Sequence, residues 1–208
     1  KNFNRQRKTV MKVRASVIKE IFRKSIHLCS GIVPLFLALF YWPVIILLIC
    51  AVVIYSICEI LRLKGHSVPI VSIITETAAR KRDEDKFVLG PVTLVIGILI
   101  AALVLPPEPA KIGIFALAFG DGCASLVGKL IGRVKIPHMG GKTFEGCLGC
   151  FTAVFIATLV VSHNPLVSLY TALVTMCIEV LPLFDFDNIL IPICVGTFYG
   201  LITGIIPF

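Results

Sequence analysis

The chain has 208 residues, of which 57% are hydrophobic and 15% are charged, and its formal net charge is +8. A water-soluble domain carries about 25% charged residues, so this composition, with a mean hydropathy of +0.97, excludes an ordinary soluble protein. The charge does not indicate nucleic-acid binding, because nine of the 20 Lys and Arg residues fall within residues 1–24. Basic clusters beside membrane spans contact anionic lipid headgroups and set topology.

The N-terminal segment has the periodicity of an amphipathic helix. Its apolar residues recur at helical spacing, with cations between them, at Val10, Val13, Val17 and Ile21. This pattern predicts a helix that lies on the membrane surface, and the long basic stretch is not typical of a cleavable signal peptide. We therefore expect a basic amphipathic helix at residues 1–24 and a single transmembrane domain, carrying the chemistry, at residues 25–208.

Seven apolar segments follow, each near the length of about 20 residues that crosses a bilayer. They lie at roughly 26–41, 44–61, 89–105, 111–128, 146–162, 166–183 and 189–206. The sequence thus predicts an all-α, polytopic membrane protein with about seven transmembrane helices, and breaks are expected at Pro34 and Gly97. Most of the eight cysteines lie inside these apolar runs, where they act as small hydrophobic residues.

The basic residues predict an orientation. With a cytoplasmic N-terminus, residues 62–88 and 129–145 form inner loops, and 19 of the 20 Lys and Arg residues lie on the inner side. Lys111 is the exception, and the C-terminus lies on the opposite side. The polar clusters beyond the N-terminus also fall on the inner face, so we expect a reaction site on the cytoplasmic side.

The motif GDGCASLVGKLIGR at residues 120–133 combines glycines with charge beside an apolar span. An ionisable group there indicates a functional site, and Asp121 is a candidate Mg²⁺ ligand because that ion prefers carboxylate and phosphate oxygens. Candidate nucleotide contacts in this motif are Gly120, Gly122, Ser125, Lys129 and Arg133. The alternative is a small-residue face for helix packing, although packing alone does not require an aspartate.

The motif KIPHMGGKTFEG at residues 135–146 is a second candidate phosphate site. Backbone N–H groups and an ammonium at Gly140, Gly141, Lys142 and Thr143 suit a phosphate. It is not a P-loop, because Ile136 stands where that pattern requires glycine. The alternative is an ordinary basic loop. Glu145, at the head of the next span, argues against that alternative.

Two weaker clusters complete the candidate site. EVLPLFDFDN at residues 179–188 provides Glu179, Asp185, Asp187 and Asn188, which could share a divalent metal or supply a general base; a polar helix-capping turn is the alternative. RKSIH at residues 23–27 provides Arg23, Lys24 and His27, which could contact phosphate or snorkel to the interface. Glu59 and Arg62, at spacing i, i+3, are expected to form a local ion pair.

In their order and topology, these four motifs resemble the polyprenol kinase superfamily, which includes dolichol kinase, phytol kinase and the CTP-dependent diacylglycerol kinases. The resemblance covers almost the whole chain. It implies Mg²⁺-dependent transfer of the γ-phosphoryl group of CTP to the hydroxyl of a membrane lipid alcohol, which fits a reaction that mostly needs positioning and charge neutralisation.

On this basis the candidate residues divide into four sets. Asp121, Asp185 and Asp187 are expected at the metal. Lys129, Lys142 and Arg133 are expected at the triphosphate, with the glycines, Ser125, Thr143 and Asn188 around it. The candidate catalytic set is Asp121, Lys142, Glu145, Glu179 and Asp187. Arg23, Lys24 and His27 are expected on the lipid side.

Two other functions compete with a lipid-alcohol kinase. A CDP-lipid synthase such as phosphatidate cytidylyltransferase, to which the superfamily is distantly similar, uses the same nucleotide but attacks its α-phosphorus. The paired-aspartate signature of that enzyme is not reproduced here. A transporter or channel is the remoter alternative, and it predicts polar groups on both faces and an inverted repeat, neither of which the sequence indicates.

Overall fold

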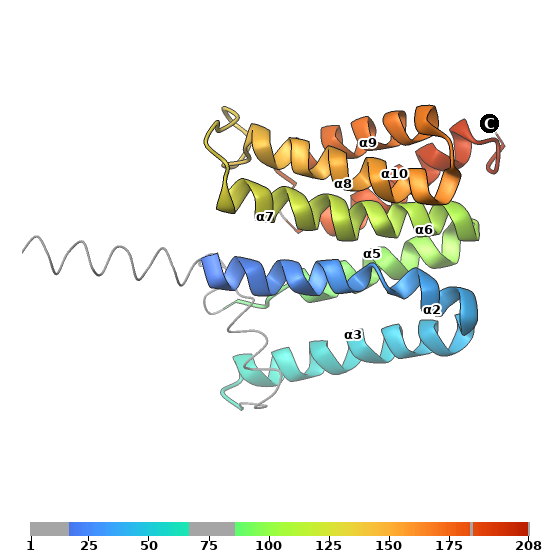
Figure 1. The fold of residues 1–208 in the computed structure, drawn as a ribbon. Helices are drawn as coiled ribbons and strands as arrows, with labels where there is room; N and C mark the ends of the chain where they lie inside the picture. The colour runs from blue at the N-terminus through green and yellow to red at the C-terminus, as the bar shows by residue number, and fades with distance from the viewer. Residues whose placement is uncertain (1–16, 67–85, 184, 208) are drawn as a thin grey trace, which may run out of the picture.

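In a computed structural model, residues 17–66, 86–183 and 185–207 are described, and most of them are helical (Figure 1). Residues 1–16 of the expected amphipathic helix lie outside the described part. Residues 17–30 form one continuous helix that passes through the expected boundary at residue 24 without a break.

The helices follow the seven apolar segments in chain order. The first helix turns at Gly31 and Ile32 and continues as α2. The bounds are α2 Val33–Leu39, α3 Tyr41–Leu63, α5 Gly90–Val104, α6 Pro107–Phe115, η2 Ala116–Asp121, α7 Gly122–Leu130, α8 Phe144–Ser162, α9 Pro165–Val180 and α10 Asp187–Ile202. The segments α6, η2 and α7 form one rod, so each predicted segment corresponds to one rod.

The all-α fold is confirmed for the described residues, whereas the number of spans stays a prediction. Within the described residues, four helices are long and apolar enough to cross a membrane: Val17–Leu39, Tyr41–Leu63, Pro107–Leu130 and Phe144–Ser162. The other three, α5, α9 and α10, have 15, 16 and 16 residues. A helix of 16 residues is about 24 Å long, which is less than the ~30 Å hydrocarbon core.

One of the two expected breakpoints is correct. The first rod turns at Gly31, and Pro34 lies in the first turn of α2, where its missing N–H needs no partner. Gly97 does not break α5. Its role is close packing, because a Cβ on Gly97 would lie 2.0 Å from the main-chain oxygen of Asn188 on α10.

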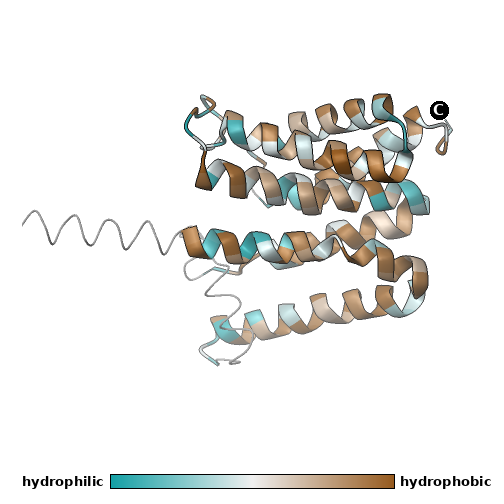
Figure 2. Ribbon diagram, in the orientation of Figure 1, coloured by the Kyte–Doolittle hydropathy of each residue, from teal (hydrophilic) through white to brown (hydrophobic). Residues whose placement is uncertain are grey.

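The rod α6–η2–α7 is the most enclosed of the long helices, while α3 lies at the edge of the bundle (Figure 1). In the most apolar stretch of 18 residues, 61% of the α6–η2–α7 rod is buried, compared with 11% of α3. Hydrophobic residues run along the length of α3 (Figure 2), which suits contact with lipid. The buried core around the central rod includes Ile98, Ile112, Leu117, Ile191 and Val195.

The polar connections gather at one end of the bundle. The 131–143 loop and the 181–183 turn lie there, on the left in Figure 1, whereas the turns at 105–106 and 163–164 lie at the other end. Helix α9 stops short of α7 and α8 at this end, because Pro182 follows closely after its last residue. Two cavities lie at this polar end, and they hold the candidate site.

Candidate active site

Asp121 is placed by an unusual turn of the central rod. The six residues of η2 form a π-helix that ends at Asp121, and π-helical turns often occur at functional sites. Asp121 is 1% exposed, and it lies about 14 Å, or nine residues, from the polar end of α7. A carboxylate at that depth is costly unless it has charged partners.

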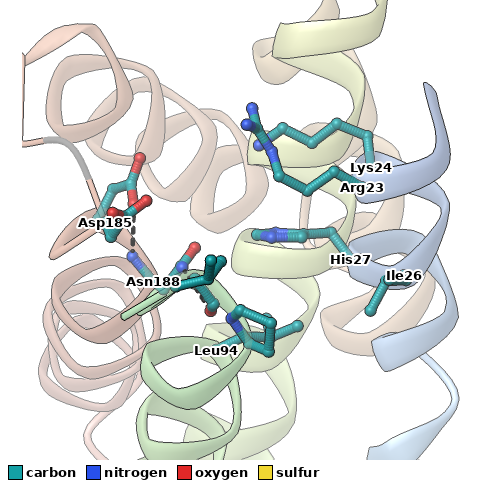
Figure 3. Close-up of a pocket in the computed structure, with 11 residues that line it drawn as sticks. Arg23, Lys24, Ile26, His27, Leu94, Asp185 and Asn188 are labelled. Carbon is teal, nitrogen blue, oxygen red and sulfur yellow. Dashed lines mark hydrogen bonds between the residues drawn. The ribbon is translucent and has the colours of Figure 1, made fainter. Parts of the chain in front are cut away.

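The first helix supplies those partners. Lys24 Nζ donates to Asp121 Oδ2, and His27 Nδ1 lies 2.9 Å from the same oxygen. Lys24 and His27 are only 2% and 5% exposed, and at spacing i, i+3 they share one face of the helix. Figure 3 shows both side chains projecting from this helix into the interior. Gly122 allows the close approach, since a Cβ there would lie 2.9 Å from a side-chain carbon of Leu28.

Three carboxylates converge at this point. They are Asp121 of η2, Glu179 in the last turn of α9 and Asp187 at the first position of α10. Each offers one carboxylate oxygen, and these oxygens lie within 4.8 Å of one another. We call this group the carboxylate cluster. Mg²⁺ binds carboxylate oxygens at about 2.1 Å, so opposite ligands lie about 4.2 Å apart. Small side-chain shifts would bring the cluster to that geometry, and the residues present therefore fit the ion.

The loop after α7 carries a lysine to the cluster. Lys142 Nζ donates to both the carboxylate and the main-chain oxygen of Glu179. The loop folds back on itself, with Ile136 N donating to Lys142 O at 2.9 Å and Phe144 N to Val134 O at 2.9 Å. This reversal uses Gly140 and Gly141, whose φ angles of +62° and +88° favour glycine.

An open cleft of about 200 Å³ lies beside Glu179. We call it the glycine-rich cleft. It is lined by Glu20, Ala124, Ser125, Gly128, Lys129, Gly140, Gly141, Lys142, Thr143, Gly146, Cys147 and Glu179. The structure thus brings together six of the expected nucleotide contacts, namely Ser125, Lys129, Gly140, Gly141, Lys142 and Thr143. The Thr143 hydroxyl also caps α8 by accepting from Gly146 N at 3.1 Å.

A second cavity lies on the other side of the cluster (Figure 3), and we call it the apolar-walled pocket. It is lined by Arg23, Lys24, Ile26, His27, Val88, Gly90, Pro91, Leu94, Asp185, Asp187 and Asn188. The expected lipid-side residues Arg23, Lys24 and His27 are all present, and Arg23 also pairs with Glu20 at 2.6 Å. Asp185 lies here, outside the carboxylate cluster.

Several expected site residues lie elsewhere and have packing or positioning roles. Gly120 packs on α8 and α9, since a Cβ there would lie 3.0 Å from Val154 and 3.2 Å from Thr175. The Glu145 carboxylate accepts from the backbone N–H groups of Arg133 and Val134 at 2.9 and 3.2 Å. It therefore holds the loop after α7, and the exposed Arg133 does not line the glycine-rich cleft.

Sequence comparison with known proteins identifies relatives of this chain. An uncharacterized protein of Methanocaldococcus jannaschii is 31% identical over 135 residues, which are 64% of this chain and 68% of that protein. A probable phytol kinase of Glycine max is 26% identical over 155 residues, 70% of this chain and 50% of that protein. A farnesol kinase of Arabidopsis thaliana is 31% identical over 86 residues, 40% of this chain and 28% of that protein. The chain therefore belongs to the same family as the Methanocaldococcus jannaschii protein, and it is similar to plant proteins named phytol kinase and farnesol kinase.

The matched region spans half or less of the length of these two plant relatives. No protein-family model matches it, and no solved structure does.

Sequence reasoning missed two polar residues of this candidate site. Thr93 of α5 is buried, and its hydroxyl accepts from Asn188 Nδ2 at 2.9 Å, which fixes the start of α10 beside the cluster. Glu20 lines the glycine-rich cleft. A threonine inside an apolar run carries no signal of its own, whereas an acidic residue in the basic segment before the first span was a usable signal.

Proposed function

We propose that this protein is a membrane kinase that transfers the γ-phosphoryl group of CTP to the hydroxyl of a lipid alcohol such as a polyprenol, a phytol-like isoprenoid or diacylglycerol. The observation that carries the proposal is the carboxylate cluster, which adjoins a glycine-rich basic cleft on one side and an apolar-walled pocket on the other. The names of the plant relatives, phytol kinase and farnesol kinase, support the reaction class. The preference for CTP rests on the resemblance of the sequence motifs.

The glycine-rich cleft suits the triphosphate. Lys129 is exposed at its edge and Lys142 reaches its floor. Gly140 and Gly141 leave room for phosphate oxygens beside the backbone, since no atom lies within 4 Å of a Cβ on Gly141. Cations and backbone N–H groups are the usual partners of phosphate in proteins.

The metal would be held by the carboxylate cluster. Asp121, Glu179 and Asp187 provide oxygen ligands from three different elements, and Lys24 and Lys142 offset part of their negative charge. A bound Mg²⁺ would neutralise phosphate oxygens and orient them for in-line transfer. Asp185 lies two residues before Asp187, outside the cluster, and is assigned to the pocket wall.

The proposed reaction is a phosphoryl transfer in which one bond forms and one bond breaks. The lipid hydroxyl oxygen forms a bond to the γ-phosphorus, and the bond from that phosphorus to the β,γ-bridging oxygen breaks. The electron pair of the broken bond stays with the oxygen of the leaving CDP. The hydroxyl proton passes to a carboxylate of the cluster, and the lipid monophosphate is the second product. The protein contributes position and charge, which are the main requirements of this chemistry.

The membrane arrangement follows the distribution of charge. The polar end of the bundle is assigned to the cytoplasm, where nucleotides are available, and the C-terminus to the opposite side. The N-terminal cations are assigned to anionic lipid headgroups. An alcohol dissolved in the bilayer would reach the site from between the helices, at headgroup depth.

The test supplies purified protein with Mg²⁺ and a panel of phytol, farnesol, dolichol, diacylglycerol and phosphatidate, the last being the acceptor that a CDP-lipid synthase requires. The nucleotide is CTP or ATP labelled at either the α or the γ position. We expect the γ label, and not the α label, in a lipid monophosphate. Incorporation of the α label would identify a CDP-lipid synthase. Incorporation of neither label would refute both enzyme assignments.

A further inference from the structure

The carboxylate cluster can be approached from two separate cavities. Glu179 faces the glycine-rich cleft, Asp187 faces the apolar-walled pocket, and no residue is common to the two linings. A transfer between two substrates needs such access, because the donor and the acceptor must reach the same point from different directions. If the nucleotide occupies the cleft, the pocket is open to the other substrate.

The pocket has the chemistry of a lipid headgroup site. Its lining combines the apolar side chains of Ile26, Val88, Pro91 and Leu94 with polar groups that include His27, Asp187 and Asn188. Figure 3 shows Asn188 across the pocket from His27, with Leu94 below them. A molecule with one hydroxyl and a hydrocarbon tail matches this division.

The pocket is less suited to a second polyphosphate. The glycine-rich cleft presents the exposed Lys129 and four glycines beside the engaged Lys142. The pocket has a single glycine, and both of its cations are engaged with carboxylates, since Lys24 donates to Asp121 and Arg23 pairs with Glu20. Asp185 and Asp187 also lie in its lining, and their negative charge would repel phosphate. A neutral hydroxyl meets no such repulsion, and it can donate to a carboxylate.

We infer that the apolar-walled pocket is the acceptor site, with the hydroxyl beside Asp187 and the first carbons of the tail against Leu94 and Ile26. This inference rests on the proposed function, and it makes Leu94 and Ile26 the residues that determine acceptor specificity. Ile26 and Pro91 are partly exposed, so the apolar wall reaches the surface of the bundle and the tail can continue into lipid.

The rim of the pocket is held by the outlying helix α3. Val88 N donates to the fully buried Glu59 carboxylate at 2.9 Å, and Tyr55 Oη donates to Val88 O at 3.1 Å. Arg62 joins the same arrangement, bonding Glu59 at 2.8 and 2.9 Å and Lys86 O at 3.0 Å. The wall at Val88 is therefore fixed before a substrate arrives, which lowers the cost of ordering on binding.

The kinetic test fills the pocket with Leu94→Trp and uses Leu103→Trp as the matched control. Both lie on α5, but Leu94 is 4% exposed and Leu103 is 52% exposed. We expect Leu94→Trp to raise the KM for farnesol at least tenfold while the KM for the nucleotide changes less than twofold, and Leu103→Trp to change neither. An unchanged acceptor KM in a folded Leu94→Trp variant would overturn the inference.

A binding test on the unmodified protein covers the case in which Leu94→Trp does not fold. A farnesol analogue with a photoreactive diazirine near its hydroxyl is cross-linked in detergent without nucleotide, and the labelled peptides are identified by mass spectrometry. We expect labelling within residues 23–27, 86–94 or 185–188, all of which contribute to the pocket lining, and we expect unlabelled farnesol to suppress it. Labelling confined to residues 125–146, or to the lipid-facing side of α3, would overturn the acceptor assignment.

The two proposals fail in different ways. Wild-type protein that phosphorylates no alcohol but is labelled in the pocket refutes the kinase and leaves a lipid-alcohol binding site. Wild-type protein that phosphorylates an alcohol but is labelled elsewhere retains the kinase and refutes the acceptor pocket.

Discussion

Lys142 and Glu179 are joined twice, because the lysine ammonium donates to both the side-chain carboxylate and the main-chain oxygen of the glutamate. Glu179 is 3% exposed, whereas the lysine side chain is 26% exposed. The lysine therefore connects the buried carboxylate cluster with the glycine-rich cleft at the polar end. One residue of a surface loop thus couples the end of α9 to the cleft assigned to the triphosphate.

Removal of the Lys142 ammonium should abolish most phosphoryl transfer. In Lys142→Ala, Glu179 loses its counter-charge and the γ-phosphate loses a cation, and loss of one such group lowers kcat by about 10²–10³-fold in comparable sites. The measurement is γ-phosphoryl transfer from CTP under saturating acceptor.

Lys135→Ala is the matched control, since Lys135 is an exposed lysine of the same loop that does not line the cleft. It should retain wild-type turnover. Thermal melting in detergent separates loss of chemistry from loss of fold, and a folded Lys142→Ala with kcat within twofold of wild type would remove Lys142 from the site.

The sequence predicted the helices and the polar end well, because both depend on local properties. Apolar runs of near-bilayer length predicted all seven rods, and the charge pattern placed Asp121 and Lys142 in one site. The structure brings them together through Glu179, which belongs to the carboxylate cluster with Asp121 and binds Lys142. The i, i+3 ion pair of Glu59 and Arg62 is also present, at 2.8 Å.

The remaining contacts depend on distances between helices, which periodicity does not contain. Glu145 looked like a chemical group at the head of a span, but the preceding loop folds back and places two backbone N–H groups on it. Asp185 and Asp187 were both expected at the metal. Only the position at which α10 begins assigns Asp187 to the cluster and Asp185 to the pocket wall.

That difference between Asp185 and Asp187 is directly testable with Mn²⁺ as a substitute for Mg²⁺. Asp187→Asn should weaken Mn²⁺ binding at least tenfold, because one of three oxygen ligands loses its charge. Asp185→Asn, two residues away, should bind Mn²⁺ as the wild type does. Electron paramagnetic resonance of free and bound Mn²⁺ gives both affinities, and equal weakening by the two variants would argue against the metal assignment.

A methyl group on Gly97 should destabilise the protein by about 1–3 kcal/mol. The added Cβ would lie 2.0 Å from the oxygen of Asn188, a carbonyl that has no helical N–H partner because Pro192 stands four residues later. Helix α10 would have to move, and Asp187 with it. Differential scanning fluorimetry in detergent should show a lower Tm for Gly97→Ala.

Gly90→Ala is the control for stability, since a Cβ there meets nothing within 4 Å. Its Tm should equal that of the wild type. If Gly97→Ala melts at the wild-type temperature, then α5 and α10 do not pack as closely as the structure has them.

Glu59 should act on acceptor binding although it lies on a helix at the edge of the bundle. In Glu59→Ala, Val88 N and the Arg62 guanidinium lose their carboxylate, and a buried donor left without a partner costs about 1–3 kcal/mol. The Val88 wall should loosen, so the KM for farnesol should rise several-fold while kcat and the nucleotide KM stay within twofold. Glu59→Gln keeps an oxygen for Val88 N and should recover most of the acceptor affinity.

Glu108→Ala is the matched control for Glu59, because Glu108 accepts a hydrogen bond from Tyr199 Oη at 2.5 Å and lies at the opposite end of the bundle. Its loss should lower the Tm without changing either KM. A purely structural role for Glu59 predicts that both alanine variants lose stability alike and leave the acceptor KM unchanged. A selective rise of the acceptor KM in Glu59→Ala, reversed by glutamine, would instead show that α3 positions the acceptor site.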